Sequence, residues 1–359
     1  MPICKSGTAF VSFNYRDMDV ALNNRRWLLA SRPDEKMAVE NFRFSEEEFQ
    51  KPDLADRQIL VRNRMFACAP TLRNWVNQEG KSYRASAQLE VPIVGMAGVD
   101  VIDSRHPDFP KGSRHILLSR WEDYSVIEPD KFATPTLPVA ADLPFEKAMS
   151  IFGLNSMTAY FGITRIGRPA RGETVVVSGA AGSTGSMAAQ IARIIGARVI
   201  GIAGGKTKCD WLRDELGLDD AIDYKTEDVG ARLAELCPDG VNVFYDNVGG
   251  EILQAVMDNI ARKGRIAVCG QISAYDSDKL SQGPNDMMKL VYWSVRIEGF
   301  LLGDFVDDFD EARSSLEKWY AEGLLVNRTD LRNGIENLPA SFLDLFSGRN
   351  EGTLLVSAD

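Results

Sequence analysis

The sequence predicts an α/β protein in which a doubly wound parallel sheet is joined to a second, β-rich domain. From Thr174 onward, apolar strands alternate with segments of helical length, whereas residues 24–150 hold short apolar runs between turn residues. The length of 359 residues suffices for two domains of ordinary size. Strands that alternate with helices form a parallel sheet that is covered on both faces.

The β-rich domain is expected over residues 24–150, after an N-terminal extension over 1–23. Apolar runs at Gln58–Arg62, Pro92–Val101 and His115–Ser119 are separated by Gly, Pro, Asn and Asp clusters. The N-terminal extension has no long apolar core and carries acidic residues, so it does not resemble a signal peptide.

The α/β domain is expected over residues 151–321. The strand Thr174–Ser178 precedes a helix over 183–196, and a strand over 197–203 precedes a helix near 206–216. Four later strands have the sequences DAIDY, VNVFYD, GRIAVCG and VRIEGFLL, with helices near 226–236, 251–262 and 285–293 between them. Residues 322–359 return to short strands and one helix, and this tail is expected to fold back onto the β-rich domain.

Composition excludes several functions. The net charge of −10 disfavours nucleic acid as a partner, and no stretch of about 20 apolar residues predicts a membrane span. Five cysteines occur singly and only two histidines are present, so neither a disulfide framework nor a zinc site is expected. A reducing, cytoplasmic location is the expected setting.

A glycine-rich loop directly follows the first strand of the α/β domain. The segment Gly179–Gly185 has the spacing GxxGxxG, and a helical pattern begins behind it. Small residues let the backbone turn sharply and approach a pyrophosphate, while the helix N-terminus offers N–H donors. The alternative is a tight strand–helix turn without a ligand.

The end of the second strand of this domain bears on the choice between NAD and NADP. An NAD site usually places an acid there, but this strand ends in Ala203-Gly-Gly-Lys206-Thr-Lys208. Lysines attract a 2′-phosphate, so NADPH is favoured. The alternative for Lys206 and Lys208 is solvated charge at a helix start. Asn247 and Ser273 follow two later strands, where they would contact ribose or nicotinamide or only form turns.

A run of motifs in this order resembles a known family. The segments VVVSGAAGSTGSMAAQIAR, DYKT, YDNVGG, GRIAVCGQIS and VRIEGF are similar to the zinc-independent medium-chain dehydrogenase/reductases, nearest to their alkenal/alkenone double-bond reductases. The resemblance extends over roughly residues 24–356. It implies a GroES-like β-rich domain, an inserted Rossmann domain, a homodimer and NADPH as cofactor.

The resemblance also implies residue roles. Tyr292 matches a tyrosine thought to steady an enolate or relay a proton; the alternative is a packed aromatic at a helix end. Contacts to NADPH are implied for Ala181, Gly182, Ser183, Thr184, Gly185, Lys208, Tyr224, Asn247, Cys269, Gly270, Ile272, Ser273, Tyr275, Phe300, Leu301, Leu302 and Asn350.

The implied reaction is the reduction of a carbon–carbon double bond conjugated to a ketone or aldehyde, with hydride added to the β-carbon. One departure concerns the substrate: a DPY-like stretch of the family is Ala69-Pro70-Thr71 here, without its tyrosine. A quinone or enoyl-thioester reductase, a carbonyl or alcohol dehydrogenase, and a non-catalytic NADPH-binding protein therefore stay open as alternatives.

Overall fold

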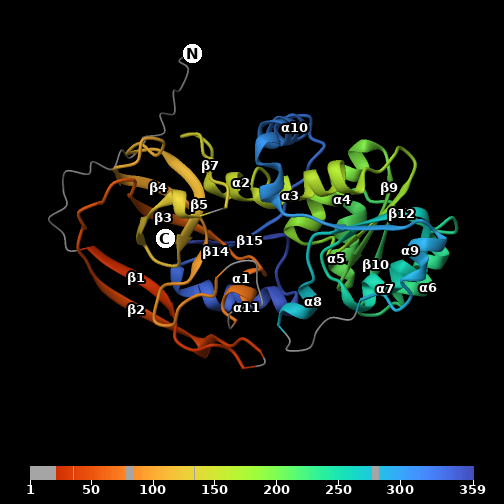
Figure 1. The fold of residues 1–359 in the computed structure, drawn as a ribbon, viewed down its shortest axis with the longest axis horizontal. Coiled ribbons are helices and arrows are strands. Elements are labelled where there is room, and N and C mark those ends of the chain that lie inside the picture. The colour runs from red at the N-terminus through yellow and green to blue at the C-terminus, as the bar shows by residue number, and fades with distance from the viewer. Residues whose placement is uncertain (1–21, 35, 78–84, 133, 277–282) are drawn as a thin grey trace, which may run out of the picture.

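A computed structural model of the chain describes residues 22–34, 36–77, 85–132, 134–276 and 283–359. Figure 1 shows two domains side by side, with the β-rich part on the left and the α/β part on the right. The C-terminal strands, drawn in blue, run back between them. The predicted fold class, a Rossmann domain inserted into a GroES-like β-rich domain, is confirmed.

The α/β domain is built on a six-stranded parallel sheet of order β10-β9-β8-β11-β12-β13. Its strands are β8 (Thr174–Ser178), β9 (Arg198–Ala203), β10 (Asp220–Asp223), β11 (Val241–Asp246), β12 (Ile260–Val268) and β13 (Arg296–Gly299). The chain first builds outward from β8 to β10 and then continues on the other side of β8 with β11. This reversal makes the carboxyl ends of β8 and β11 the switch point of the sheet.

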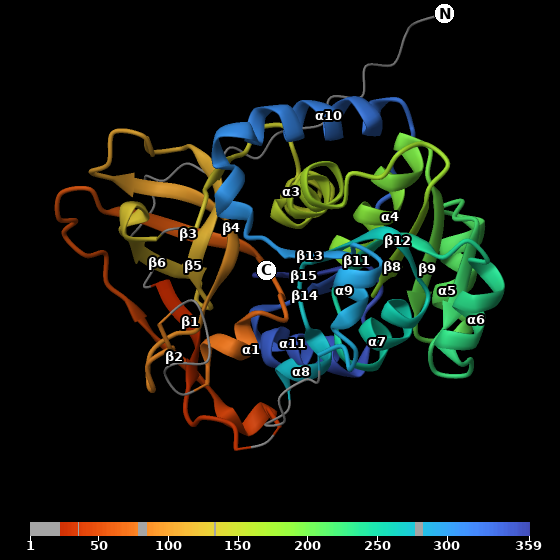
Figure 2. The same ribbon diagram turned by 45° about the vertical axis from the view of Figure 1, so that its right-hand side comes forward.

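Helices cover both faces of this sheet. One buried cluster joins β8 to side chains of α3 (Leu154–Phe161), α4 (Ser183–Ile195), α5 (Lys206–Asp214) and α10 (Phe309–Ala321). A second joins β11 to α6 (Val229–Leu236) and α7 (Gly250–Asp258). Figure 2 shows α10 lying along α3, where the Tyr160 hydroxyl donates to Glu311 at 2.6 Å. The remaining helices of the domain are α8 (Ile272–Tyr275) and α9 (Met288–Tyr292).

The β-rich domain is a seven-stranded sheet that contains the chain's last strands. Its order is β14-β15-β3-β4-β5-β7, with β6 paired to β3. The bounds are β3 (Ile59–Ala67), β4 (Val94–Ser104), β5 (Arg114–Arg120), β6 (Tyr124–Ile127), β7 (Leu137–Pro138), β14 (Thr329–Asn333) and β15 (Thr353–Ser357). A hairpin of β1 (Leu22–Leu29) and β2 (Phe42–Phe49) packs on it, together with α1 (Leu72–Trp75), α2 (Phe145–Met149) and α11 (Leu338–Ser347). The tail thus joins the first domain through antiparallel pairing of β15 with β3.

Two helix predictions were too long. The helix expected over 251–262 ends at Asp258, and the chain enters β12 at Ile260, which pairs with Val241 of β11. Burial of Ile260 and Ala261 beside the sheet overrides the helical periodicity there. The helix expected over 285–293 is confined to Met288–Tyr292. The domain bounds at 24, 150 and 321 stay predictions, and most of the 1–23 extension lies outside the described residues.

Candidate cofactor and substrate site

The switch point is held together by side chains at the ends of β8 and β11. The Ser178 hydroxyl donates to Asp246 Oδ1 at 2.8 Å, and Asn247 returns two bonds to Ser178. In these, the Asn247 amide donates to Ser178 Oγ at 2.8 Å and Nδ2 to the Ser178 carbonyl at 2.7 Å. Burial raises the pKa of the Asp246 carboxyl. Asn247, predicted as a cofactor contact, therefore also fixes the distance between the two strand ends.

The phosphate loop connects β8 to α4 by a close backbone approach. Gly179 has a φ of +59°, and the Gly182 amide donates to its carbonyl oxygen at 2.9 Å. A Cβ added at Gly185 would lie 2.2 Å from that same oxygen, so no larger residue fits. The helix begins behind Gly182 without a side-chain cap. Its first amides are thus available to an anion, and the loop fits the pyrophosphate of a dinucleotide.

Two neighbouring segments hold this loop in place. Ser183 Oγ accepts hydrogen bonds from Asn155 Nδ2 at 2.9 Å and from Thr353 Oγ1 at 2.8 Å. Gly182 also forms a parallel bridge with Gly352 of the tail. Because a hydroxyl has one donor hydrogen besides its acceptor sites, Ser183 keeps a donor for a phosphate oxygen. The loop therefore lies between α3 and the tail that completes the β-rich sheet.

The structure separates the two lysines that follow β9. Lys208 is half-buried, and its Nζ donates to the Gly348 carbonyl at 2.7 Å. Burial lowers the pKa of Lys208, and nearby Lys225 adds to the shift. The Lys206 side chain is 86% exposed and pairs with Asp210 at 2.6 Å. Lys208 therefore lies inside the candidate crevice, whereas Lys206 has the surroundings of a solvated helix-start charge.

Tyr224 lies beside Lys208's end of the crevice. A Cβ added at Gly204 would come within 2.8 Å of the Tyr224 ring and 2.9 Å of Lys225 Cε, so both side chains cover the turn after β9. Tyr224 is 48% exposed. An exposed ring and two ammonium groups around one turn suit an adenosine that carries a 2′-phosphate.

The segment after β12 returns to the switch point. The amides of Cys269 and Gly270 both donate to the Asp246 carbonyl, at 2.8 and 3.1 Å. Ile272 donates to Asn247 and Ser273 to Val248, so four of the predicted cofactor residues form one layer over the end of β11; their bonds are Cys269 N and Gly270 N to Asp246 O, Ile272 N to Asn247 O, and Ser273 N and Oγ to Val248 O. Burial raises the pKa of the Cys269 thiol to about 11. This thiol is therefore protonated at neutral pH and is a poor nucleophile.

Sequence reasoning missed a link between this segment and the β-rich domain. Arg73 of α1 is buried, and its Nε donates to Asp276 Oδ1 at 2.9 Å, just beyond Tyr275. The Met37 amide donates to the same oxygen at 3.0 Å. The signal was a lone arginine among Leu72, Trp75 and Val76. A charge in such an apolar run needs a partner when it is buried.

The remaining predicted contacts lie at the end of β13 and in the tail. The Phe300 ring packs against Tyr245 with centroids 6.4 Å apart, while Leu301 is 53% exposed and Leu302 begins a short 3₁₀ turn. Asn350 Nδ2 donates to the Gly352 carbonyl at 3.1 Å, close to the phosphate loop. Tyr275 accepts a bond from the Gln271 amide at 3.2 Å.

Tyr292 lies at the opposite edge of the sheet. The Trp293 carbonyl accepts a bond from Lys263, in the turn within β12 before Arg265, so α9 ends at the amino edge of the sheet. From Arg265 to Cys269 the strand rises roughly 13 Å, at about 3.3 Å per residue. Tyr292 is 70% exposed beside the exposed Val291 and Trp293. Within one chain, the structure does not bring it to the other predicted site residues.

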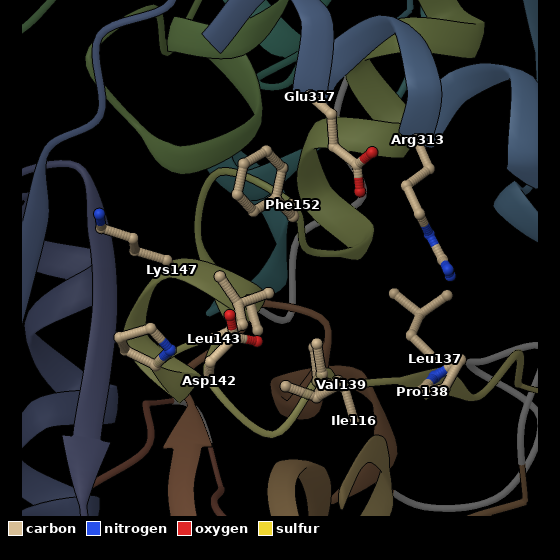
Figure 3. A pocket seen from close by; sticks show the side chains of 13 residues that line it. Ile116, Leu137, Pro138, Val139, Asp142, Leu143, Lys147, Phe152, Arg313 and Glu317 are labelled. Atoms are coloured by element: carbon tan, nitrogen blue, oxygen red, sulfur yellow. The ribbon is translucent and has the colours of Figure 1, made fainter. Parts of the chain in front are cut away.

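A separate cavity of about 450 Å³ lies at the junction of the domains. Figure 3 shows Lys147 and Phe152 on one side, Arg313 and Glu317 of α10 on another, and Val139 below. None of the predicted site residues lines it. Its lining mixes two cations and two carboxylates with apolar side chains and does not define a ligand, so we place the candidate site at the switch point.

Metal and membrane features were also examined in the described ranges. Among these residues, no group of three or more His, Cys, Asp or Glu side chains is arranged to hold a metal ion. Nor does any described helix combine the length and apolar character that a membrane crossing requires. The four described cysteines form no disulfide.

Comparisons with known proteins cover nearly the whole chain. Residues 183–318 match the family described as zinc-binding dehydrogenase, and residues 25–134 match the N-terminal domain of oxidoreductase. The NADPH-dependent curcumin reductase of Escherichia coli is 33% identical over 93% of this chain and 96% of its own length. The NADP(+)-dependent 2-alkenal reductase of Nicotiana tabacum is 36% identical over 83% and 86%. The structure of CurA from Vibrio vulnificus in complex with NADPH has a TM-score of 0.85 and 32% identity, covering 93% of this chain and 99% of that one.

Proposed function

The chain belongs to the alkenal/alkenone double-bond reductase branch of the zinc-independent medium-chain dehydrogenase/reductases, and from this premise we propose that it reduces the carbon–carbon double bond of α,β-unsaturated ketones and aldehydes. The chain is an NADP-dependent oxidoreductase, and the prediction of NADPH as its cofactor is confirmed by these relatives and by the similar structure solved with NADPH. The substrate class is the new part of the proposal.

The observation that carries the proposal is the layer at the switch point. The phosphate loop fits a pyrophosphate, Lys208 and Tyr224 lie at the adenosine end, and residues 269–275 lie over the end of β11. When bound there, NADPH supplies the hydride that adds to the β-carbon. The protein's residues orient the reactants and exclude water, which is where the gain from positioning arises.

Tyr292 is proposed to donate a hydrogen bond to the enolate oxygen that develops on the substrate. Its place at the amino edge of β13 makes this role depend on the proposed homodimer. If two β13 strands pair antiparallel, the amino end of one lies beside the carboxyl end of the other. The exposed Val291, Tyr292 and Trp293 lie next to this edge strand and support such a contact. The partner's Tyr292 would then serve the site formed by Phe300 and Leu301.

The test is an NADPH-oxidation assay on enones, enals, quinones, enoyl thioesters and saturated aldehydes, followed by product identification. The expected result is a saturated ketone or aldehyde from the enone or enal. Faster turnover of quinones or enoyl thioesters would replace the proposed substrate class. NADPH binding without oxidation of any acceptor would instead indicate a non-catalytic protein. The cytoplasmic location stays part of the proposal and is tested by fractionation.

A further inference from the structure

We infer that Arg328 is a specificity-determining residue for the 2′-phosphate of the cofactor, supplied by the β-rich domain to a site on the Rossmann domain. This inference rests on the proposed NADPH site at Lys208 and adds a residue that sequence reasoning did not select. Arg328 follows α10 and immediately precedes β14, in the tail that completes the β-rich sheet.

Arg328 reaches the helix that carries Lys208. Its guanidinium carbon lies 5.3 Å from the centroid of the Trp211 ring, in cation–π contact. Trp211 follows Lys208 by three residues on α5, so the two side chains share one face of that helix. The guanidinium is therefore next to the face from which Lys208 projects, although it comes from the other domain.

The backbone around Arg328 is fixed by the phosphate loop. A Cβ added at Gly352 would lie 2.1 Å from the Arg328 carbonyl oxygen, and the Thr353 amide donates to that oxygen at 2.9 Å. Gly352 in turn bridges Gly182. Arg328, the pyrophosphate loop and the start of α5 are thus connected by short contacts, and a cofactor that spans the crevice would meet all three.

The local charge favours a polyanion. Lys208, Lys225 and Arg328 come together from three separate segments of a chain whose net charge is −10. Each of the latter two cations disfavours the charged form of Lys208, whose pKa is lowered mainly by burial. A dianionic phosphate relieves such repulsion. Glu351, which pairs with Arg328, is the acidic residue that such a phosphate would compete with.

The experiment measures binding of 2′,5′-ADP and of 5′-AMP by isothermal titration calorimetry, so that no turnover is needed. R328M keeps an unbranched side chain over Trp211 but removes the charge. We expect about tenfold weaker binding of 2′,5′-ADP and unchanged binding of 5′-AMP. K206M is the matched control, because Lys206 is solvent-exposed on the same helix, and it should leave both affinities unchanged. E351Q should tighten 2′,5′-ADP binding about threefold.

The outcomes separate this inference from the proposed function. If K208M loses 2′,5′-ADP binding while R328M and E351Q do not alter it, the role of Arg328 is overturned and the proposed site stands. If the unaltered protein does not prefer 2′,5′-ADP to 5′-AMP, the 2′-phosphate site itself fails. An equal loss of both ligands in R328M would assign Arg328 a purely structural role. Should R328M not fold, the exposed E351Q variant decides alone.

Discussion

Lys208 of the Rossmann domain donates a hydrogen bond from Nζ to the carbonyl oxygen of Gly348 in the tail, at 2.7 Å. This bond uses one of the three N–H donors of the ammonium group, so two are left for a ligand. It also places a cation where an NAD-specific site would hold an acid near the end of β9. The relationship ties cofactor choice to the position of the tail.

Replacing Lys208 by methionine should therefore change cofactor preference. We expect kcat/KM with NADPH to fall by about tenfold to a hundredfold and kcat/KM with NADH to stay nearly constant, because only NADPH carries the 2′-phosphate. Steady-state kinetics with both coenzymes measures this. Lys206→Met is the control, and an equal loss in the two variants would contradict the assignment of Lys208.

Replacing Gly185 by alanine should disrupt the phosphate loop. The new Cβ would lie 2.2 Å from the Gly179 carbonyl oxygen, which is backbone and has little room to move. We expect a loss of about 1–3 kcal/mol in stability together with weaker NADPH binding. Thermal melts with and without NADPH measure both effects. Gly303→Ala is the matched control, since a Cβ there meets nothing within 4 Å; similar melting temperatures for the two variants would refute the prediction.

Replacing Tyr292 by phenylalanine should lower kcat by roughly tenfold to a thousandfold and leave the Kd for NADPH unchanged, because the hydroxyl is proposed to act on the enolate only. Fluorescence titration and turnover assays measure the two quantities. Unchanged turnover would remove Tyr292 from the mechanism.

A mixing experiment tests whether Tyr292 acts across the dimer. Subunits that carry Tyr292→Phe are combined with subunits that carry Gly185→Ala, after each variant has been shown to be inactive on its own. A mixed dimer has one intact cofactor loop served by an intact partner tyrosine only if the tyrosine crosses the interface. Recovery of activity is the expected result, and mixtures that stay inactive would place the tyrosine's action within its own subunit.

Glu122 should give the protein a pH-dependent stability. Burial raises the pKa of its carboxyl, which accepts hydrogen bonds from Ser125 and Asn24. The folded state therefore holds this proton more tightly than the unfolded state does. This contribution to stability declines as the pH rises from the ordinary glutamate pKa through the raised one. Glu122→Gln should melt higher than the unaltered protein at pH 7, with the difference shrinking toward pH 4. A constant difference across that range would contradict this.

The sequence was sufficient to predict the Rossmann part because each of its signals is local. Five residues of apolar strand, the glycine loop and the helix after it lie within 183 minus 174 positions of one another, so β8 and the start of α4 follow from pattern alone. The hairpin of β1 and β2 was missed, since β2 carries Glu46, Glu47 and Glu48 on exposed positions and shows little apolar alternation.

The site was less predictable because its contacts join distant segments. Arg328 and Lys208 are separated by 120 residues, and Arg73 and Asp276 by 203. Neither spacing produces a motif. The topology of the sheet also decides at which edge a helix ends, and this is why the position of Tyr292 relative to the loop required the structure.

The pairing of β15 with β3 has a consequence for biosynthesis. The first sheet lacks a central strand until residues 353–357 have left the ribosome, whereas every strand of the inserted Rossmann sheet has been made by residue 299. We therefore expect the inserted domain to fold first during translation, while the earlier-made β-rich segment waits for its last strand and is exposed to chaperones and proteases.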